Sequence, residues 1–329
     1  MFEVNNWITA ILIIWSSMLL INYASWKLED ELNILWKKLK IHPSIRWATF
    51  DAISSSLPEF ITAMMWLILL KEAWIEIWLG TISWSAIFNI LIIPFCSLLV
   101  YKGTKIVVSR KWIKRDVVFY LISIMVLLIG LFTWELFIMW FSLISVYMIY
   151  LIYLYKNRHW SSDKKQIEKD AKSVKGNKVS YFTILIALIL TFIAVHWAIN
   201  AAQFVGINLW IPTIIVALVL LAWITSIPDT FLSMKSAQKG DIDASLSNAV
   251  GSNIFDVCIW LWVPIVIWIG IMWLDPKVDF FTNIPIFIFL VVSVFVYLFV
   301  LLSKKITKKS WYLLLFMYIM FIVLLYFLI

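Results

Sequence analysis

The chain has 329 residues, of which 64% are hydrophobic and 14% are charged, and its formal net charge is +8. This composition excludes a soluble globular domain, because runs of roughly 20 apolar residues have the length of a membrane-spanning helix. The positive charge does not indicate a nucleic-acid partner, since the basic residues lie in the short gaps between apolar runs. Cys96 and Cys258 both lie inside apolar runs, so no disulfide framework is indicated.

Ten apolar segments are predicted to cross the membrane as helices. The N-terminus, Met1 to Asn6, has no basic stretch, so we expect the first segment to be kept as a span and not removed as a signal peptide. The segments cover residues 6–24, 47–70, 79–101, 116–133, 136–155, 181–203, 209–233, 244–271, 281–302 and 311–329.

The lysines and arginines predict the orientation of these segments. All of them except Lys71 and Lys277 lie in the odd-numbered gaps between segments. Because basic loops stay on the cytoplasmic side, the odd gaps are predicted to be cytoplasmic and both termini to lie outside. The chain is therefore expected to be a multi-pass protein of the cell (inner) membrane, with its longest loop, 156–180, in the cytoplasm.

Five segments precede that loop and five follow it. An odd number of spans in each half inverts the second half relative to the first, which is the plan of many secondary transporters. We predict an all-α membrane fold of two inverted five-helix repeats, 1–155 and 181–329, joined by a basic cytoplasmic linker, 156–180. The linker is expected to be a solvated, flexible connector.

Short motifs recur at corresponding places in the two halves. Ser-Leu-Pro-Glu at 56–59 matches Ser-Ile-Pro-Asp at 226–229, and Ile-Phe-Asn at 87–89 matches Ile-Phe-Asp at 254–256. The first pair lies in the second segment of each half, and the second pair lies in the third segment. Both lie within repeat motifs that span 47–101 and 209–271. Two such matches in the same order indicate an internal repeat.

Oxygen-bearing side chains gather around the two prolines of these motifs. Pro58 and Pro228 each remove one helix hydrogen bond at membrane depth, where irregular backbone is tolerated if it lines a cavity or coordinates an ion. Hydroxyl, amide and carboxyl oxygens without thiolate or imidazole favour Na⁺, K⁺ or Ca²⁺ over zinc or copper. The residues are Ser54, Ser55, Ser56, Glu59, Ser85 and Asn89 in the first half and Thr225, Ser226, Asp229, Ser252, Asn253 and Asp256 in the second.

The three acids, Glu59, Asp229 and Asp256, suggest what the site exchanges. Unpaired carboxylates cannot stay ionised in a low dielectric, and an ionisable residue within the membrane marks an ion pathway by default. Three Na⁺ would neutralise them, and so would one Ca²⁺ with one K⁺. A site that must hold one set or the other predicts obligatory exchange. Asp51, near the inner end of the second segment, is read either as a helix-start acid or as an ion-entry residue.

These motifs resemble the repeats of the Ca²⁺/cation antiporter superfamily, the sodium/calcium exchangers, and the second repeat looks most similar to the potassium-dependent branch. The resemblance implies that Glu59 and Asp229 are the central Ca²⁺ ligands, shared with Na⁺. It implies flanking Na⁺ sites at Ser85 and Ser252, and a central position for Asn89 and for Asp256, which is tied to K⁺ dependence in that branch. It further implies hydroxyl ligands and backbone carbonyl ligands, namely Ser55, Ser56, Thr225 and Ser226 and the carbonyls of Ala52 and Ala222.

Several tryptophans depart from the family pattern. Trp84 stands where the second half has Gly251, and Trp260-Leu261-Trp262 stands where the family tends to have Gly-Leu-Gly. Glycine at such points lets helices approach closely, so an indole is not expected to fit. With 21 Trp and 8 Gly in the chain, one hypothesis is that some of these tryptophans are glycines encoded by UGA. The codons of the gene decide it.

The favoured function is a Na⁺/Ca²⁺ antiporter that works by alternating access, with K⁺ coupling left open. The alternative on the same fold is a Ca²⁺/H⁺ antiporter, for which so many hydroxyl ligands are less expected. An intramembrane aspartyl hydrolase would also use buried acids but has no need of matched hydroxyl-proline repeats. Ion transport rather than catalysis is expected, with inorganic cations and the lipid bilayer as partners. The sequence indicates no cofactor and no obligatory protein partner.

Overall fold

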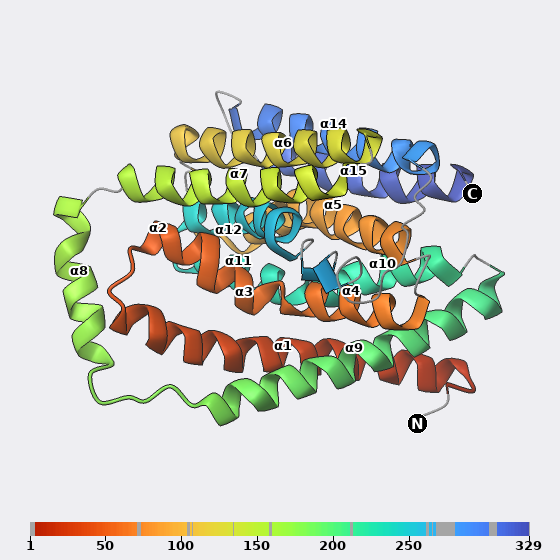
Figure 1. Cartoon of the computed structure of the whole chain (residues 1–329), viewed down its shortest axis with the longest axis horizontal. Coiled ribbons are helices and arrows are strands. Elements are labelled where there is room, and N and C mark those ends of the chain that lie inside the picture. The colour runs from red at the N-terminus through yellow and green to blue at the C-terminus, as the bar shows by residue number, and fades with distance from the viewer. Residues whose placement is uncertain are drawn as a thin grey trace.

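The computed structural model describes residues 4–70, 74–103, 106, 108–133, 135–157, 160–210, 213–260, 263–264, 266–267, 280–302 and 308–328. Every regular element in these ranges is helical (Figure 1). The helices of the first half are α1 (Trp7–Lys38), α2 (Pro43–Arg46), the π-helix η1 (Trp47–Asp51), α3 (Ala52–Ser55), α4 (Leu57–Leu70), α5 (Trp74–Val100), α6 (Arg110–Thr133) and α7 (Leu136–Lys156).

The second half repeats this order after a helix in the linker, α8 (Trp160–Ser173). Its helices are α9 (Tyr181–Leu209), α10 (Thr213–Thr225), α11 (Ile227–Gln238), α12 (Ile242–Phe255), the π-helix η3 (Asp256–Trp260), α14 (Phe280–Leu302) and α15 (Lys308–Leu328). The two-repeat helical fold predicted from the sequence is therefore the observed one.

Each of the ten predicted segments is mainly helical where the structure describes it, with interruptions at Ser56 in the second segment and at Ser226 in the seventh. Five helices are long and apolar enough to span a membrane, within the described ranges, and α4, α14 and α15 supply shorter apolar helices. The first segment was predicted too short, because α1 continues as one helix to Lys38. Of the eighth segment, 244–271, residues 261–262, 265 and 268–271 lie outside the described residues.

The two halves are packed into one another. α1 lies along α9, its counterpart, and α5 contacts α10, α11, α12, α14 and α15 of the other half. In Figure 1 both termini lie at one end of the bundle and α8 lies at the opposite end. Apart from the pairing of α1 with α9, most contacts between the halves involve α5, α10, α11 or α12.

The linker departs from the flexible connector that the sequence suggested, because α8 occupies residues 160–173. This helix contacts α1, and Asp170 on it lines a cavity against α1 and α11. It begins after the end of α7, and a short connection leads from it to Ser180, the N-cap of α9. The side-chain oxygen of Glu31 on α1 accepts the backbone N–H of Ser180 at 2.7 Å, which ties the linker to the first helix.

Candidate ion-binding site

The second segment of each half is broken at the same residue. α3 ends and α4 begins around Ser56, and α10 ends and α11 begins around Ser226. The two serines have almost the same conformation, φ −92° and ψ 6° at Ser56 and φ −81° and ψ 2° at Ser226. Pro58 and Pro228 therefore lie in the first turn of a new helix, where a missing N–H is tolerated, and not in the middle of one.

These breaks bring the acid of the first half against a hydroxyl of the second. The hydroxyls of Ser85 and Ser226 lie 2.9 Å apart, and they lie 3.3 and 3.4 Å from Oε1 of Glu59. Ser226 belongs to the same motif as Asp229, which lies near enough to Glu59 to repel it electrostatically. Thr225 also lies beside Glu59.

Asp229 is held mainly from α12. The Ser252 hydroxyl donates to Oδ1 of Asp229 at 2.6 Å, and the Asn248 amide approaches the same oxygen at 3.5 Å. Ser55 of the first half lies near this carboxylate. Each acid is therefore approached by a hydroxyl of the opposite half, Glu59 by Ser226 and Asp229 by Ser55.

The third acid, Asp256, begins the π-helix that follows α12. It lies in the electrostatic field of Glu59 and Asp229, and Ser56 lies beside it. At the corresponding position in the first half, the Asn89 amide donates to Oδ1 of Asn253 at 3.0 Å. The Asn253 amide in turn donates to the backbone carbonyl of Ala86 at 3.0 Å, so this pair joins the two halves. π-Helical turns in otherwise α-helical segments often lie at functional sites.

The predicted site residues are buried and leave oxygens without partners. Glu59 is 2% exposed, Asp229 0% and Asp256 3%. Buried polar groups are normally hydrogen-bonded, so a cluster of unpaired acceptors calls for an explanation. The buried atoms here without a hydrogen bond are Oγ of Ser56, Oε2 of Glu59, Oδ1 of Asn89, Oδ2 of Asp229 and Oδ1 of Asp256.

A cation is the group that this arrangement fits, because every one of these atoms is an oxygen and three belong to carboxylates. Among the described residues, no three His, Cys, Asp or Glu side chains are close enough to hold a metal ion by themselves. Binding would therefore depend on the hydroxyl and amide oxygens between the acids. The Ala52 carbonyl accepts one helix hydrogen bond, from the Ser56 N–H at 2.9 Å. The Ala222 carbonyl accepts the Ser226 N–H at 3.0 Å and a longer bond from the Thr225 hydroxyl at 3.5 Å.

Asn248, Ser233 and Tyr120 are at the site although the sequence reasoning did not single them out. The Asn248 amide donates to the Ser233 hydroxyl at 3.0 Å, and the Tyr120 hydroxyl of α6 lies near Asp256. Asn248 had a signal in the sequence, because residues 248, 252 and 256 repeat every four residues, a spacing that places side chains on one helix face. Tyr120 had none, since only packing of α6 against α12 brings it there.

The expectation that an indole would not fit at position 84 is wrong for this structure. Trp84 is 1% exposed and its ring lies 4.4 Å from that of Phe321 on α15. Its indole nitrogen has no hydrogen-bond partner. Trp260 is also accommodated, stacked 4.3 Å from the ring of Phe60. Trp262 lies outside the described residues.

Three acids outside the site have described contacts. Asp51 precedes α3 but its side chain makes no helix-capping hydrogen bond, so the structure does not support its reading as a helix-start acid. Asp241 caps α12, accepting the backbone N–H of Ala244 at 2.9 Å. Asp243 accepts the backbone N–H of Ser109 at 2.8 Å.

Solved transporter structures share this fold. The sodium-calcium exchanger NCX_Mj aligns over 96% of this chain and 98% of its own, with a TM-score of 0.63 and 21% identity. An H⁺/Ca²⁺ exchanger, CAX, aligns over 95% of this chain and 82% of its own, with a TM-score of 0.71 and 13% identity. At such low identities the likeness concerns the fold.

Curated relatives are similar over part or most of the chain. Sodium/potassium/calcium exchanger 3 of Rattus norvegicus is 29% identical over 45% of this chain and 23% of its own length. The match thus spans less than a quarter of that relative. Inner membrane protein YrbG of Escherichia coli is 26% identical over 79% of each chain. The family model described as sodium/calcium exchanger protein matches residues 9–157 and 179–327, one match in each half. The chain therefore belongs to the sodium/calcium exchanger protein family.

Proposed function

We propose that this protein is a secondary antiporter that exchanges Na⁺ for Ca²⁺ across the membrane by alternating access. The observation that carries the proposal is the contact of Glu59 with both Ser85 and Ser226, which joins the broken helices of the two halves. An ion held there is liganded from both halves at once. A rocking movement of one half against the other would expose such an ion to either side in turn.

The chemistry of the ligands supports alternate occupancy by Na⁺ and Ca²⁺. Glu59 and Asp229 repel each other in a buried site, so the ion-free site is penalised and must refill before the protein can change state. We assign Ca²⁺ to Glu59 and Asp229, with Na⁺ sharing them and using the hydroxyls of Ser85 and Ser252 on either side. The remaining ligands would be Ser55, Ser56, Thr225, Ser226, Asn89 and Asp256 and the carbonyls of Ala52 and Ala222.

Alternating access requires two units that move relative to each other. We propose that residues 1–155 and 181–329 are the two moving units and that 156–180 links them on the cytoplasmic side. The family model supports this division, since its two matches end and begin at 157 and 179. With the basic gaps inside, both termini face outward and the protein resides in the cell membrane.

We also propose that K⁺ is transported together with Ca²⁺. The names of several relatives include potassium, and of the three site acids Asp256 alone has no carboxylate counterpart in the other half, where Asn89 stands. A third carboxylate supplies the charge for a K⁺ carried with Ca²⁺.

A Ca²⁺/H⁺ antiporter remains the second candidate on the same fold. In such a protein protons would replace Na⁺ at the carboxylates, and hydroxyl ligands for Na⁺ beside each acid would be less expected. The Ser85 and Ser226 hydroxyls, which meet at Glu59, favour Na⁺.

Uptake of radiolabelled Ca²⁺ into proteoliposomes tests the proposal. Vesicles loaded with Na⁺ and diluted into Na⁺-free buffer should accumulate Ca²⁺, and K⁺-loaded or choline-loaded vesicles should not. Uptake driven equally well by a pH gradient without Na⁺ would favour the second candidate. The absence of uptake under all of these gradients would contradict both.

A further inference from the structure

A polar cavity of about 320 Å³ lies at the α8 end of the bundle, between α1, η1, α11 and the linker helix. Acidic and basic side chains line it in equal number, among them Glu29 on α1, Asp170 on α8 and Lys239 just after α11. We call it the linker-side cavity. Two of its charged residues are Arg46, which precedes the π-helix η1, and Asp51, which ends it.

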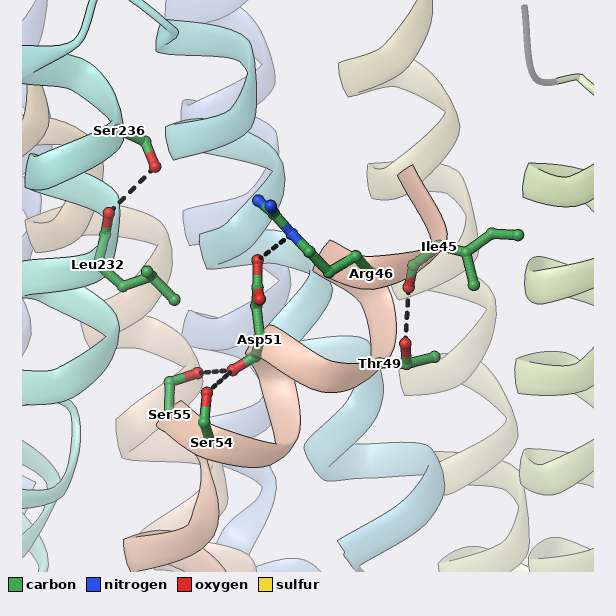
Figure 2. Close-up of polar contacts among 8 residues, drawn as sticks. All are labelled: Ile45, Arg46, Thr49, Asp51, Ser54, Ser55, Leu232 and Ser236. Carbon is green, nitrogen blue, oxygen red and sulfur yellow. Dashed lines mark hydrogen bonds and ion pairs between the residues drawn. The ribbon is translucent and has the colours of Figure 1, made fainter. Parts of the chain in front are cut away.

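Arg46 and Asp51 form an ion pair at the inner wall of this cavity. Nε of Arg46 donates to Oδ2 of Asp51 at 3.0 Å, and Figure 2 shows the guanidinium lying directly over the carboxylate. The Arg46 side chain is 27% exposed and that of Asp51 11%, so the arginine is the more accessible partner of a pair in which both residues line the cavity. The guanidinium also lies 4.8 Å from the ring of Trp36 on α1, which gives it a second favourable contact.

Asp51 lies one helical turn from the ion-binding site. Its backbone carbonyl accepts the hydroxyls of Ser54 and Ser55 at 2.9 and 2.8 Å (Figure 2). Ser55 lies beside Asp229. A chain of contacts therefore links the cavity to the central carboxylates through Asp51 and Ser55, and Arg46 lies at its outer end.

We propose that Arg46 is a tethered cation that closes the linker-side entrance of the ion site by occupying Asp51, and that a transported cation enters by displacing it. The proposal rests on the proposed transport function and adds a residue that sets access from one side. A guanidinium and an arriving cation compete for the same carboxylate, so entry requires Arg46 to move. Trp36 offers the displaced guanidinium a place within its reach.

Cysteine labelling tests the gate without requiring transport. In a background with Cys96→Ala and Cys258→Ala, the variant Ser54→Cys places a thiol directly behind Asp51. A membrane-impermeant thiol reagent applied at the linker side should react with this thiol faster when Arg46→Gln is added. The expected increase in labelling rate is roughly twofold to fivefold, which corresponds to the usual free energy of a partly exposed ion pair. Arg46→Lys, which keeps a cation, should leave the rate near that of the parent.

Lys239→Gln is the matched control, because it removes the same charge from the same cavity without touching Asp51. An equal acceleration by Lys239→Gln, or none by Arg46→Gln, overturns the gate. Should Arg46→Gln fail to elute as a single species, Asp51→Asn removes the pair from its other side and must accelerate labelling in its place.

The transport readout is the KM for Ca²⁺ in Ca²⁺–Ca²⁺ exchange, measured with right-side-out and inverted membrane vesicles. Arg46→Gln should lower the KM at the linker face and leave the KM at the opposite face unchanged. Equal shifts at both faces would overturn the gate. If the unaltered protein shows no Ca²⁺–Ca²⁺ exchange, the proposed function is contradicted instead. The labelling result would still show whether Arg46 controls access to Ser54→Cys.

Discussion

The two broken helices, α3–α4 and α10–α11, are alike in backbone but hold their carboxylates differently. Asp229 receives a short 2.6 Å hydrogen bond from Ser252 and a longer contact from Asn248. Glu59 receives longer contacts of 3.3 and 3.4 Å from Ser85 and Ser226, and Thr225 also lies beside it. Glu59 also has one more methylene. The second half thus fixes its acid, and the first half leaves its acid freer to follow an ion.

A second difference between the halves concerns charge. Asp256 in the second half stands against Asn89 in the first, whereas the first half adds Asp51 and Arg46 at the linker-side cavity. The ion cage is therefore more negative on the side of the second half. The two repeats are therefore alike in backbone and differ in side chains. Variants can be chosen that enlarge or remove the differences in hydrogen bonding and in charge.

The largest effect is expected from neutralising either motif acid. Glu59→Gln and Asp229→Asn should each lower Na⁺-driven Ca²⁺ uptake by roughly 100-fold or more, because losing a buried charged partner costs about 3–5 kcal/mol. Uptake into proteoliposomes with equal amounts of reconstituted protein measures it. Asp241→Asn serves as the control, since asparagine also caps a helix. Substantial uptake by Glu59→Gln alone would mean that only the second half binds the ion.

The next largest effect concerns Trp84, which stands at the place of Gly251. Trp84→Gly should lower the free energy of unfolding by about 3 kcal/mol or more, because it empties a fully buried site against Phe321. Thermal unfolding in detergent reads this out. Trp210→Gly is the control, since Trp210 is 95% exposed with φ 57°, a backbone conformation that favours glycine.

The outcome also bears on the codon hypothesis. If Trp84→Gly is more stable or more active than the unaltered chain, the packing of Trp84 is not the native one and a UGA-encoded glycine is favoured. A more stable Trp210→Gly carries no such meaning, because relief of the left-handed backbone accounts for it.

Removing the charge difference between the halves should have a smaller effect. Asp256→Asn makes the two halves equivalent at this position, and it should abolish any stimulation of Ca²⁺ uptake by K⁺ while uptake driven by Na⁺ persists. Uptake with and without K⁺, before and after the substitution, gives the comparison. Persisting K⁺ stimulation in Asp256→Asn would place the K⁺ ligand elsewhere.

The smallest effect is a difference between two serines. Ser252→Ala should raise the KM for Na⁺ by roughly tenfold, because hydrogen bonds to charged groups are worth about 1.5–3 kcal/mol. Ser85→Ala removes longer contacts and should raise it less. Na⁺-dependence of uptake measures both. Equal shifts would show that the two acids are held alike and would remove the contrast between the halves.

Much of this architecture follows from hydrophobic length and from the repeated motifs. Runs of apolar residues predicted the helices, and Ser-Leu-Pro-Glu and Ser-Ile-Pro-Asp predicted where each half would break. The same motifs predicted that Glu59 and Asp229 would lie close together, and the Ser226 hydroxyl that contacts Glu59 accords with that arrangement. Helix breaks of this kind depend on local sequence, namely a proline and the residues beside it.

Features that depend on packing between distant segments could not be predicted in this way. The fit of Trp84 against Phe321 requires the position of α15, and Tyr120 reaches Asp256 only through the contact of α6 with α12. The pairing of Arg46 with Asp51 depends on the π-helical turn between them, which no simple periodicity marks. The linker helix α8 likewise lies against a surface that only the folded bundle provides.

Equilibrium binding of radiolabelled Ca²⁺ to the purified protein tests most directly whether the two acids form one site. The variants are Glu59→Gln, Asp229→Asn and the double substitution. One shared cage predicts that each single substitution weakens binding nearly as much as both together. Independent losses that add in the double variant, with each single variant retaining part of the bound Ca²⁺, would mean two separate sites and would contradict the account.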